Sequence, residues 1–456
     1  MTQVKGNSAT LRYAANMWPY HPELLARPVP RYTSYPTAVE FTDAVGESHF
    51  RDALGQVAHG QPLSLYVHIP FCKEICWYCG CNTGRANRSQ RLSSYLDALH
   101  TEIQMVAGLL GGRGTVGHIA FGGGSPNAIS PVEFARLLDV LLVSFRSKNP
   151  VLSVELDPRS LPADWDMTLA ATGVSRVSLG VQTFDPAIQA AIGRVQPHAL
   201  IVDTVERLRA AGIGSINFDL MYGLPGQSAE ILTTTLDQTI ALSPERIALF
   251  GYAHVPHLLP RQKQVQADAL PDQTERFAMA ALGYERLTAA GYVPIGFDHF
   301  AKPGDLLARA AQSGQCHRNF QGFTDDGSDI LIGFGASAIS QFPDRIIQNE
   351  KHSGRYRMMC SAHRLPATRG VLRDADDRLR AATIEALLCQ GEADISKLGA
   401  IMPDSHVLRP FFEAGLADMA GTRLIITPEG RPYARTIAAL FDRYRTDPAQ
   451  RFSSAI

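Results

Sequence analysis

The sequence predicts an α/β protein: a partial (β/α) TIM-like barrel with an irregular N-terminal arm and a small, mainly helical, winged-helix-like C-terminal domain. Short, β-rich apolar runs alternate with amphipathic helical stretches from residue 63 onward, and this alternation stops near residue 365. Strands separated by helices form parallel sheets from right-handed βα units. Because at least six such repeats follow one another, a complete or partial barrel is favoured over a Rossmann sheet.

Composition supports a globular chain. Of 456 residues, 45% are hydrophobic and 19% are charged, which excludes a disordered or low-complexity scaffold. The 43 basic and 44 acidic side chains nearly cancel, so no nucleic-acid partner is expected. No apolar run reaches about 18 residues and no secretory signal is visible, so we expect no membrane span and a cytoplasmic location.

Three regions follow in chain order. Residues 1–60 form the expected arm, because RPVPRYTSYPTAVEF (27–41) contains three prolines and two tyrosines without a sustained period. Residues 61–365 form the expected barrel core, and its β-rich runs lie at 63–70, 116–124, 152–158, 175–184, 215–225, 246–254 and 292–300. Residues 366–456 form the expected C-terminal domain, with helices at 374–390 and 406–416 and a strand, turn and helix over 423–444.

Conspicuous residues stand where the β-rich runs end. They are Cys72, Gly122 to Gly124, Glu155, Gln182, Asp219 and His254. In parallel β/α folds the loops converge at the carboxyl edge of the strands, where ligands bind. The sequence therefore predicts one pocket that all these loops face.

Four of the seven cysteines fall within ten residues. Cys72, Cys76 and Cys79 have the spacing C-x3-C-x2-C, and Cys81 follows directly after Gly80. In a reducing compartment such a cluster indicates metal binding or catalysis, and thiolates suit zinc or iron–sulfur clusters. Zinc sites usually pair one C-x2-C with a second half, and no second half is visible.

The spacing leaves two ligand sets open. Three cysteines on a four-iron cube leave one iron without a protein ligand, which is typical of a reactive centre with an open position. Alternatively, Cys81 closes the cluster and the chain is a plain electron carrier. That second interpretation leaves the glycine run FGGGSP (121–126) unexplained.

Four stretches together carry a family resemblance: PRYTSYPTA (30–38), CKEICWYCGC (72–81), YAHVP (252–256) and HRNFQGF (317–323). The chain resembles the radical S-adenosylmethionine (SAM) enzymes and, among them, the oxygen-independent coproporphyrinogen III oxidases. The resemblance implies a partial barrel of the radical SAM type, a [4Fe-4S] cluster on Cys72, Cys76 and Cys79, and two SAM molecules.

The resemblance also implies further site residues. SAM contacts are expected from Tyr66, Tyr78, Gly123, Gly124, Ser125, Glu155, Gln182, Arg194, Asp219, Ala253 and Ile339. A second SAM or the substrate is expected near Cys81, Phe320, Gln321, Arg31, His299, His317 and Arg318, with Tyr32 and Tyr35 of the arm capping the pocket. Taken singly, most of these residue types are more often structural.

The implied reaction belongs to heme biosynthesis. A SAM-derived 5′-deoxyadenosyl radical would start the oxidative decarboxylation of two propionates of coproporphyrinogen III to vinyl groups, giving protoporphyrinogen IX. A low-potential flavodoxin or ferredoxin system would supply electrons to a monomeric enzyme. The alternative is a radical-SAM-like heme chaperone without oxidase activity, but those relatives lack the Cys81 position, the arm motif and HRNFQGF, all of which are present here.

Overall fold

The computed structural model describes residues 18–86 and 89–445, and its main feature is one curved sheet of twelve strands. Six strands follow the chain order and pair in parallel with their neighbours. They are β1 (Pro62–Ile69), β4 (Thr115–Gly123), β5 (Val151–Leu156), β6 (Arg176–Gln182), β7 (Ser215–Tyr222) and β8 (Arg246–Gly251). The predicted partial β/α barrel is therefore confirmed.

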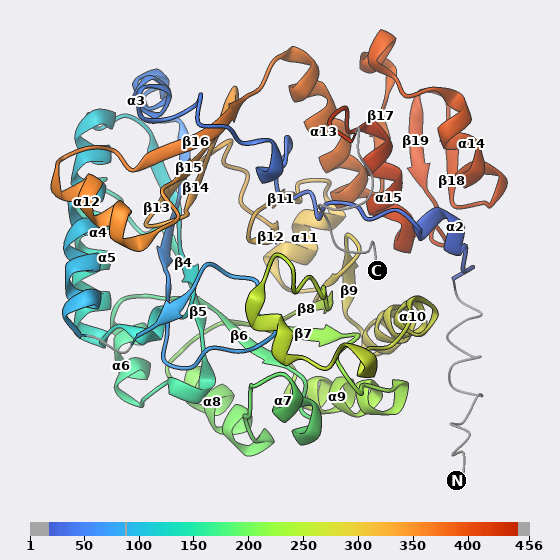
Figure 1. Ribbon diagram of the computed structural model, residues 1–456, viewed down its shortest axis with the longest axis horizontal. Helices are drawn as coiled ribbons and strands as arrows, with labels where there is room; N and C mark the ends of the chain where they lie inside the picture. The colour runs from blue at the N-terminus through green and yellow to red at the C-terminus, as the bar shows by residue number, and fades with distance from the viewer. Residues whose placement is uncertain (1–17, 87–88, 446–456) are drawn as a thin grey trace.

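Helices cover the outer side of these strands (Figure 1). They are α4 (Ser89–Leu110), α5 (Pro131–Ser144), α6 (Asp164–Ala171), α7 (Pro186–Ala191), α8 (His198–Ala210), α9 (Ala229–Leu242) and α10 (Gln273–Ala289). The start of α5 shows why the sequence forms a helix there. Ser130 and Glu133 cap each other's backbone N–H groups and proline occupies the first turn, which leaves fewer unpaired donors.

Antiparallel strands extend the sheet at both edges. β13 (Ile330–Phe334) pairs in parallel with β1, and β14 (Ile339–Phe342), β15 (Arg345–Asn349) and β16 (Ala367–Leu372) continue from it. The main sheet thus runs to Leu372, beyond the boundary expected at residue 365, because β16 completes the hydrogen bonds of β15.

The run at 292–300 differs from expectation. We expected one further strand of the parallel set, but the structure has a hairpin of β9 (Val293–Ile295) and β10 (His299–Ala301). Gly296 has φ +55° between the two strands, a conformation that glycine adopts at little cost. β10 then runs antiparallel to β8, and β9 forms the second edge of the sheet.

The arm is less irregular than predicted. It contains α2 (Pro22–Leu25), a 3₁₀ turn η1 (Ala38–Glu40) and α3 (Glu47–Gln56), a ten-residue helix whose Phe50 and Leu54 are buried. Residues 1–17 of the expected arm lie outside the described residues. Shorter elements near the sheet are β2 (Phe71–Cys72), β3 (Gly84–Arg85), η2 (Pro126–Ala128), η3 (Pro158–Ser160), η4 (Pro260–Gln264), η5 (Ala267–Ala269), α11 (Leu306–Gln312), β11 (His317–Asn319), β12 (Gly322–Thr324) and α12 (Ser353–Ser361).

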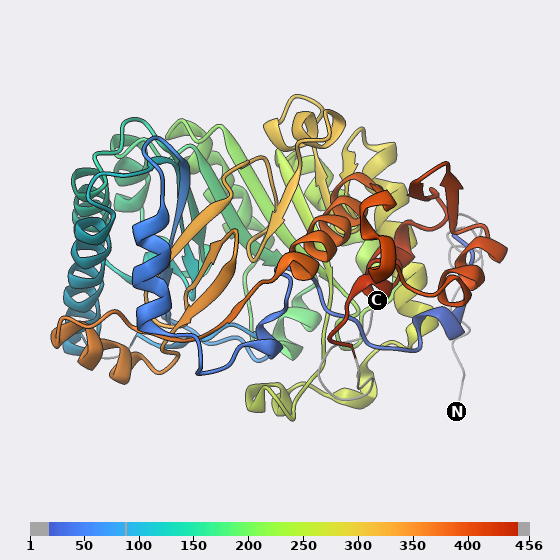
Figure 2. The same cartoon turned by 90° about the horizontal axis from the view of Figure 1, so that it is seen from above.

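The C-terminal unit combines helices with a small antiparallel sheet. Its elements are α13 (Ala375–Gln390), β17 (Glu392–Asp394), η6 (Ser396–Ile401), α14 (Ser405–Glu413), β18 (Ala417–Ala420), β19 (Arg423–Ile426), η7 (Arg431–Tyr433), α15 (Ala434–Ala438) and η8 (Ala439–Phe441). It sits at one end of the molecule, whereas α4 lies at the other (Figure 2). Residues 446–456 of the expected C-terminal domain lie outside the described residues.

Hydrogen bonds join the arm to the C-terminal unit. Tyr32 donates to Asp442 at 2.9 Å, and Tyr433 donates to the carbonyl of Pro19 at 2.7 Å. Since these partners are about four hundred positions apart, the contacts close the chain back on itself. None of the helices within residues 18–86 and 89–445 has the length and apolar character that crossing a membrane requires.

Candidate active site

The cysteine loop leaves β1 and forms one wall of a cavity of about 450 Å³ at the carboxyl edge of the parallel strands. Cys72, Cys76, Cys79 and Cys81 all line it. Within the described part of the chain, no three His, Cys, Asp or Glu side chains converge closely enough to hold a single metal ion. Four thiols spread along one wall instead match a group larger than one ion, and soft sulfur donors are the ligands of iron–sulfur clusters.

The thiols differ in how readily they ionise. Burial raises the pKa of Cys72 to about 12. The hydrogen bond with Cys81 lowers the pKa of Cys79 to about 6, helped by the positive charges of Arg261 and Arg194. The thiolate is the form that binds metal, so Cys79 is prepared for ligation near neutral pH. Cys72 needs a nearby positive centre to lose its proton.

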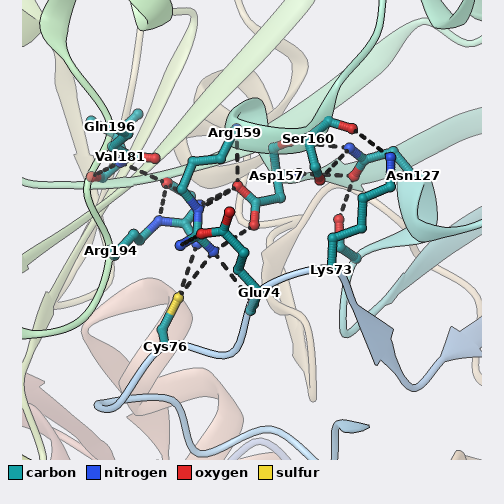
Figure 3. Close-up of polar contacts among 12 residues, drawn as sticks. Lys73, Glu74, Cys76, Asn127, Asp157, Arg159, Ser160, Val181, Arg194 and Gln196 are labelled. Carbon is teal, nitrogen blue, oxygen red and sulfur yellow. Dashed lines mark hydrogen bonds and ion pairs between the residues drawn. The ribbon is translucent and has the colours of Figure 1, made fainter. Parts of the chain in front are cut away.

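Two arginines converge on the sulfur of Cys76 (Figure 3). Arg159 donates to it at 3.2 Å and Arg194 at 3.3 Å. Both guanidinium groups also pair with Asp157, at 2.7 and 3.2 Å respectively. The Asp157 carboxylate therefore fixes the two cations that stabilise negative charge on the Cys76 sulfur.

The sequence analysis missed Asp157 and Arg159. Their signal was present, because Asp157 stands near the end of the run at 152–158 and Arg159 follows that run directly, at the edge where ligands were expected. Arg194 was predicted as a SAM contact. It also donates to the carbonyl of Gly180 at 2.6 Å, so most of its hydrogen-bonding capacity serves to fix its own position.

The carboxyl groups of Glu155 and Asp219 also line this cavity. Glu155 accepts from the N–H of Gly123 at 3.1 Å, and burial raises the pKa of Glu155 to about 7, with the Asp219 charge adding to the effect. Asp219 accepts from Ser178 at 3.0 Å and from Asn217 at 2.9 Å. Neither carboxyl group forms an ion pair with a residue in the described ranges, and buried carboxyls of this kind favour a positively charged ligand.

The glycine run leaves space for the Glu155 carboxyl group. A Cβ on Gly122 would lie 2.6 Å from the Glu155 carboxyl group, which is far inside van der Waals contact. On Gly124 it would lie 2.5 Å from the carbonyl oxygen of Phe71. The glycines therefore let β4 pack directly against Glu155 and the cysteine loop, in addition to lining the cavity.

Gln182 is held in a strained backbone conformation at the cavity. Its φ is +62°, a left-handed value that residues other than glycine seldom adopt. Its side-chain oxygen is buried and has no hydrogen-bond partner among the described residues. Strain and an unpaired buried acceptor in a cavity wall are both typical of a ligand contact. With the thiols and the buried carboxyls, this orphaned acceptor fits a cluster and a polar, cationic organic ligand such as SAM.

Most of the residues predicted for the first SAM share this cavity. It is lined by Tyr78, Gly123, Gly124, Glu155, Gln182, Arg194, Asp219 and Ala253, and also by Arg31. Three predicted contacts do not line it. Ser125 is buried and donates to Asn127, Ile339 lies on β14, and Tyr66 packs edge-to-face on Phe320 with ring centroids 4.5 Å apart.

The residues predicted for a second SAM or the substrate divide into two groups. Gln321 and His299 line a neighbouring cavity of about 180 Å³, which shares Glu155 and Asp219 with the first. His317 contacts Glu385 of α13 at 3.3 Å, and Arg318 donates to the carbonyl of Arg31 at 3.2 Å.

Tyr32 and Tyr35, predicted to cap the pocket, are buried against the C-terminal unit. Tyr35 accepts from the N–H of Arg443 at 3.1 Å, and Tyr32 donates to Asp442. Both hydroxyl groups bind the C-terminal unit and neither tyrosine lines the cavity, whereas Arg31 of the same arm does.

This chain matches both a superfamily model and individual known proteins. The model of the radical SAM superfamily matches residues 66–238. A protein of Bradyrhizobium diazoefficiens named oxygen-independent coproporphyrinogen III oxidase is 40% identical over 435 residues, covering 93% of this chain and 96% of that protein. One of the same name from Paracoccus denitrificans is 41% identical over 429 residues, covering 91% and 94%.

A solved structure matches as well. Coproporphyrinogen III oxidase from Escherichia coli, described as a radical SAM enzyme, superposes with a TM-score of 0.87 at 35% identity, over 94% of this chain and all of that one. Similarity at this level spans the arm, the barrel and the C-terminal unit together. The chain therefore belongs to the oxygen-independent coproporphyrinogen III oxidases of the radical SAM superfamily.

Proposed function

We propose that the protein converts coproporphyrinogen III to protoporphyrinogen IX without oxygen, by oxidative decarboxylation of two propionate side chains to vinyl groups. Membership of the family supports the reaction. The observation that supports this reaction for the present chain is one cavity, which is lined by four thiols together with Glu155, Gln182 and Asp219. A cavity of this kind combines soft metal donors with contacts for a polar cation.

Cys72, Cys76 and Cys79 would hold the [4Fe-4S] cluster. When bound, the cluster and SAM supply the one-electron chemistry that removes a hydrogen atom from the β-carbon of a propionate. Arg159 and Arg194 donate to the Cys76 sulfur and offset its negative charge. Cys81 lies beside Cys79, whose sulfur accepts from the Cys81 N–H at 3.4 Å, and would tune Cys79. That Cys81 is not a fourth ligand rests on the family resemblance.

Glu155, Asp219 and Gln182 would orient SAM. The two carboxyls offer acceptors for ammonium and ribose groups, and the unpaired oxygen of Gln182 offers one more. Tyr78 and Ala253 supply apolar surface on the same wall. Holding the reacting groups in a fixed geometry and excluding water are the protein's contributions to the rate.

A second SAM molecule would occupy the 180 Å³ cavity next to the first. The two cavities share Glu155, Ser178, Asp219 and Phe250, so a ligand in one contacts a wall of the other. Gln321 would provide the polar contact that distinguishes this position. A low-potential flavodoxin or ferredoxin donor, a monomeric state and a cytoplasmic location complete the proposal, and they rest on the family resemblance.

Anaerobic reconstitution with iron and sulfide, followed by assay with coproporphyrinogen III, SAM and a reductant, tests this function. We expect about four irons per chain and the formation of 5′-deoxyadenosine together with a divinyl product. Tight heme binding with neither product would identify a heme chaperone instead. An iron–sulfur cluster that is reduced reversibly but does not cleave SAM would identify an electron carrier.

A further inference from the structure

The cavity lined by Cys72, Cys76, Cys79 and Cys81 is called the thiol cavity from here on. A small cavity lined by arginines adjoins it. Its volume is about 50 Å³, and Arg31, Arg276 and Arg435 line it together with Asp298. We call it the arginine cavity. Arg31 and Phe250 line both cavities and so form their common wall. Because one water needs roughly 10–15 Å³, the space admits a group of carboxylate size but no ring system.

The four arginines in and beside this cavity come from distant parts of the chain. Arg31 lies in the arm, Arg276 on α10 and Arg435 on α15. Arg318 of β11 contacts the backbone of Arg31. Arg31 donates to the carbonyl of Gly251 at 3.0 Å and Arg276 to that of Tyr252 at 2.8 Å. Each of these two arginines is therefore fixed by a neutral backbone group and not by a carboxylate.

Arg318 and Arg435 share one aromatic ring. Their guanidinium carbons lie 4.9 and 5.2 Å from the centroid of Phe297. Arg318 is only 9% exposed, and one of its terminal nitrogens has no hydrogen-bond partner within the described ranges, as is also the case for Nε of Arg276. The ring offsets part of the cost of burying the two cations, whereas two buried donors without acceptors are unfavourable and call for an acceptor at this position.

Too little negative charge is present to balance these cations. Among the described residues that line the arginine cavity, Asp298 is the one carboxylate, and its oxygen lies 2.6 Å from Nδ1 of His299. None of the four arginines forms an ion pair with a residue that the structure describes. Burial, together with the charge of Arg31, lowers the pKa of Arg435 to about 10, so this guanidinium stays protonated at neutral pH.

We propose that the arginine cavity binds a propionate carboxylate of the tetrapyrrole, with Arg31, Arg276 and Arg435 as its hydrogen-bond donors. The proposal rests on the proposed function. A guanidinium group matches a carboxylate with two parallel hydrogen bonds, and a carboxylate fills the space that a ring does not. The tetrapyrrole ring then lies on the other side of Phe250, next to the cavity assigned to the cluster and the first SAM. Arg318 is a positioning residue, since it holds the backbone of Arg31.

Fluorescence titration of the reconstituted protein with two probes tests this site. The probes are coproporphyrin III, which carries four free carboxylates, and its tetramethyl ester, which carries none. We expect Arg276→Gln and Arg435→Gln each to weaken binding of coproporphyrin III about tenfold or more, because a hydrogen bond to a charged group is lost. Binding of the ester should stay unchanged, and Arg435→Lys should recover part of the lost affinity for the free acid.

Arg431→Gln is the matched control. Arg431 lies four positions from Arg435, donates to the carbonyl of Gly296 at 2.8 Å and stacks on Tyr284 at 5.3 Å, but it does not line the arginine cavity. We expect it to bind both probes like the wild type. Iron content and SAM cleavage by dithionite without tetrapyrrole should be unchanged in every variant, which shows that the thiol cavity is intact.

The inference fails if Arg276→Gln and Arg435→Gln bind coproporphyrin III as tightly as Arg431→Gln does, or if they lose affinity for the ester to the same extent. If the wild type discriminates the free acid from the ester but forms no divinyl product from coproporphyrinogen III, the carboxylate site stands and the proposed reaction is wrong. The two failures are therefore distinguishable.

Discussion

Arg194 and Cys76 are 118 positions apart, yet a terminal nitrogen of Arg194 lies 3.3 Å from the Cys76 sulfur. Asp157 pairs with the same guanidinium group and with Arg159 of η3, which contacts that sulfur as well (Figure 3). A predicted cluster ligand thus has two cationic partners whose positions are fixed by one buried carboxylate. The thiol cavity therefore contains fixed cations that stabilise negative charge on the Cys76 sulfur, in addition to the spaced cysteines.

Arg159→Met should lower the reduction potential of the reconstituted cluster by tens of millivolts. The substitution removes a positive charge and a hydrogen bond from the Cys76 sulfur, which favours the more oxidised cluster. Redox titration followed by electron paramagnetic resonance measures this shift. Arg207→Met is the control, because Arg207 pairs with Asp166 away from the cysteine loop. Equal potentials in the two variants would contradict the assigned contact.

Cys81→Ala should retain iron, sulfide and SAM cleavage, whereas Cys76→Ala should lose the cluster. Cys81 is exposed, but Cys76 is buried between two arginines. Iron and sulfide analysis after anaerobic reconstitution, with a 5′-deoxyadenosine assay, separates the two variants. Loss of the cluster from Cys81→Ala would make Cys81 a ligand and favour an electron carrier.

Gly122→Ala should impair SAM binding without removing iron. The added methyl group would lie 2.6 Å from the Glu155 carboxyl group and would displace it from the cavity wall. Gly117→Ala on the same strand is a matched control, since a Cβ there has no neighbour within 4 Å. Equilibrium binding of SAM to both reconstituted variants provides the comparison. Equal SAM affinity in both variants would contradict the role of Glu155 as a SAM contact.

SAM affinity should rise with pH through the neutral range. Burial raises the pKa of Glu155 to about 7, so below that pH the free protein holds this carboxyl group protonated. A cationic ligand favours the ionised form, so binding below about pH 7 releases a proton and becomes tighter as pH increases. Calorimetry in two buffers of different ionisation enthalpy detects the released proton. Glu155→Gln should abolish this dependence, and an unchanged profile in that variant would assign the proton to another group.

Glu102→Gln should destabilise the fold by about 1–3 kcal/mol without changing the cysteine loop. Glu102 on α4 is buried and accepts from the N–H of Gly335 at 2.8 Å, from Asn349 at 2.6 Å and from Tyr356 at 2.6 Å. An amide replaces one acceptor oxygen by a donor and leaves one of these groups unpaired. Chemical denaturation reports the loss, and Glu206→Gln on the exposed side of α8 should cost almost nothing.

Much of the fold could be predicted because its signals are local. The alternation of β-rich runs and amphipathic helices predicted the parallel strands, and the glycines and polar residues at the ends of the runs marked the edge that carries the cavity. The hairpin of β9 and β10 could not be predicted in this way, since the apolar pattern of a short strand does not reveal whether its partner runs parallel or antiparallel. The helix α3 was missed because the proline-rich segment before it dominated the interpretation of the arm.

By itself, the sequence determined which residue types were available at the carboxyl edge: the spaced thiols, the glycine run, and a polar residue after each parallel strand. Only the tertiary structure decided which long-range partners those residues have. Asp157 and Arg159 meet Arg194 at Cys76, and four arginines from the arm, α10, β11 and α15 gather around Phe297 and Phe250. Spacing along a chain fixes contacts within a few residues, whereas side chains hundreds of positions apart come together only through the packing of whole elements.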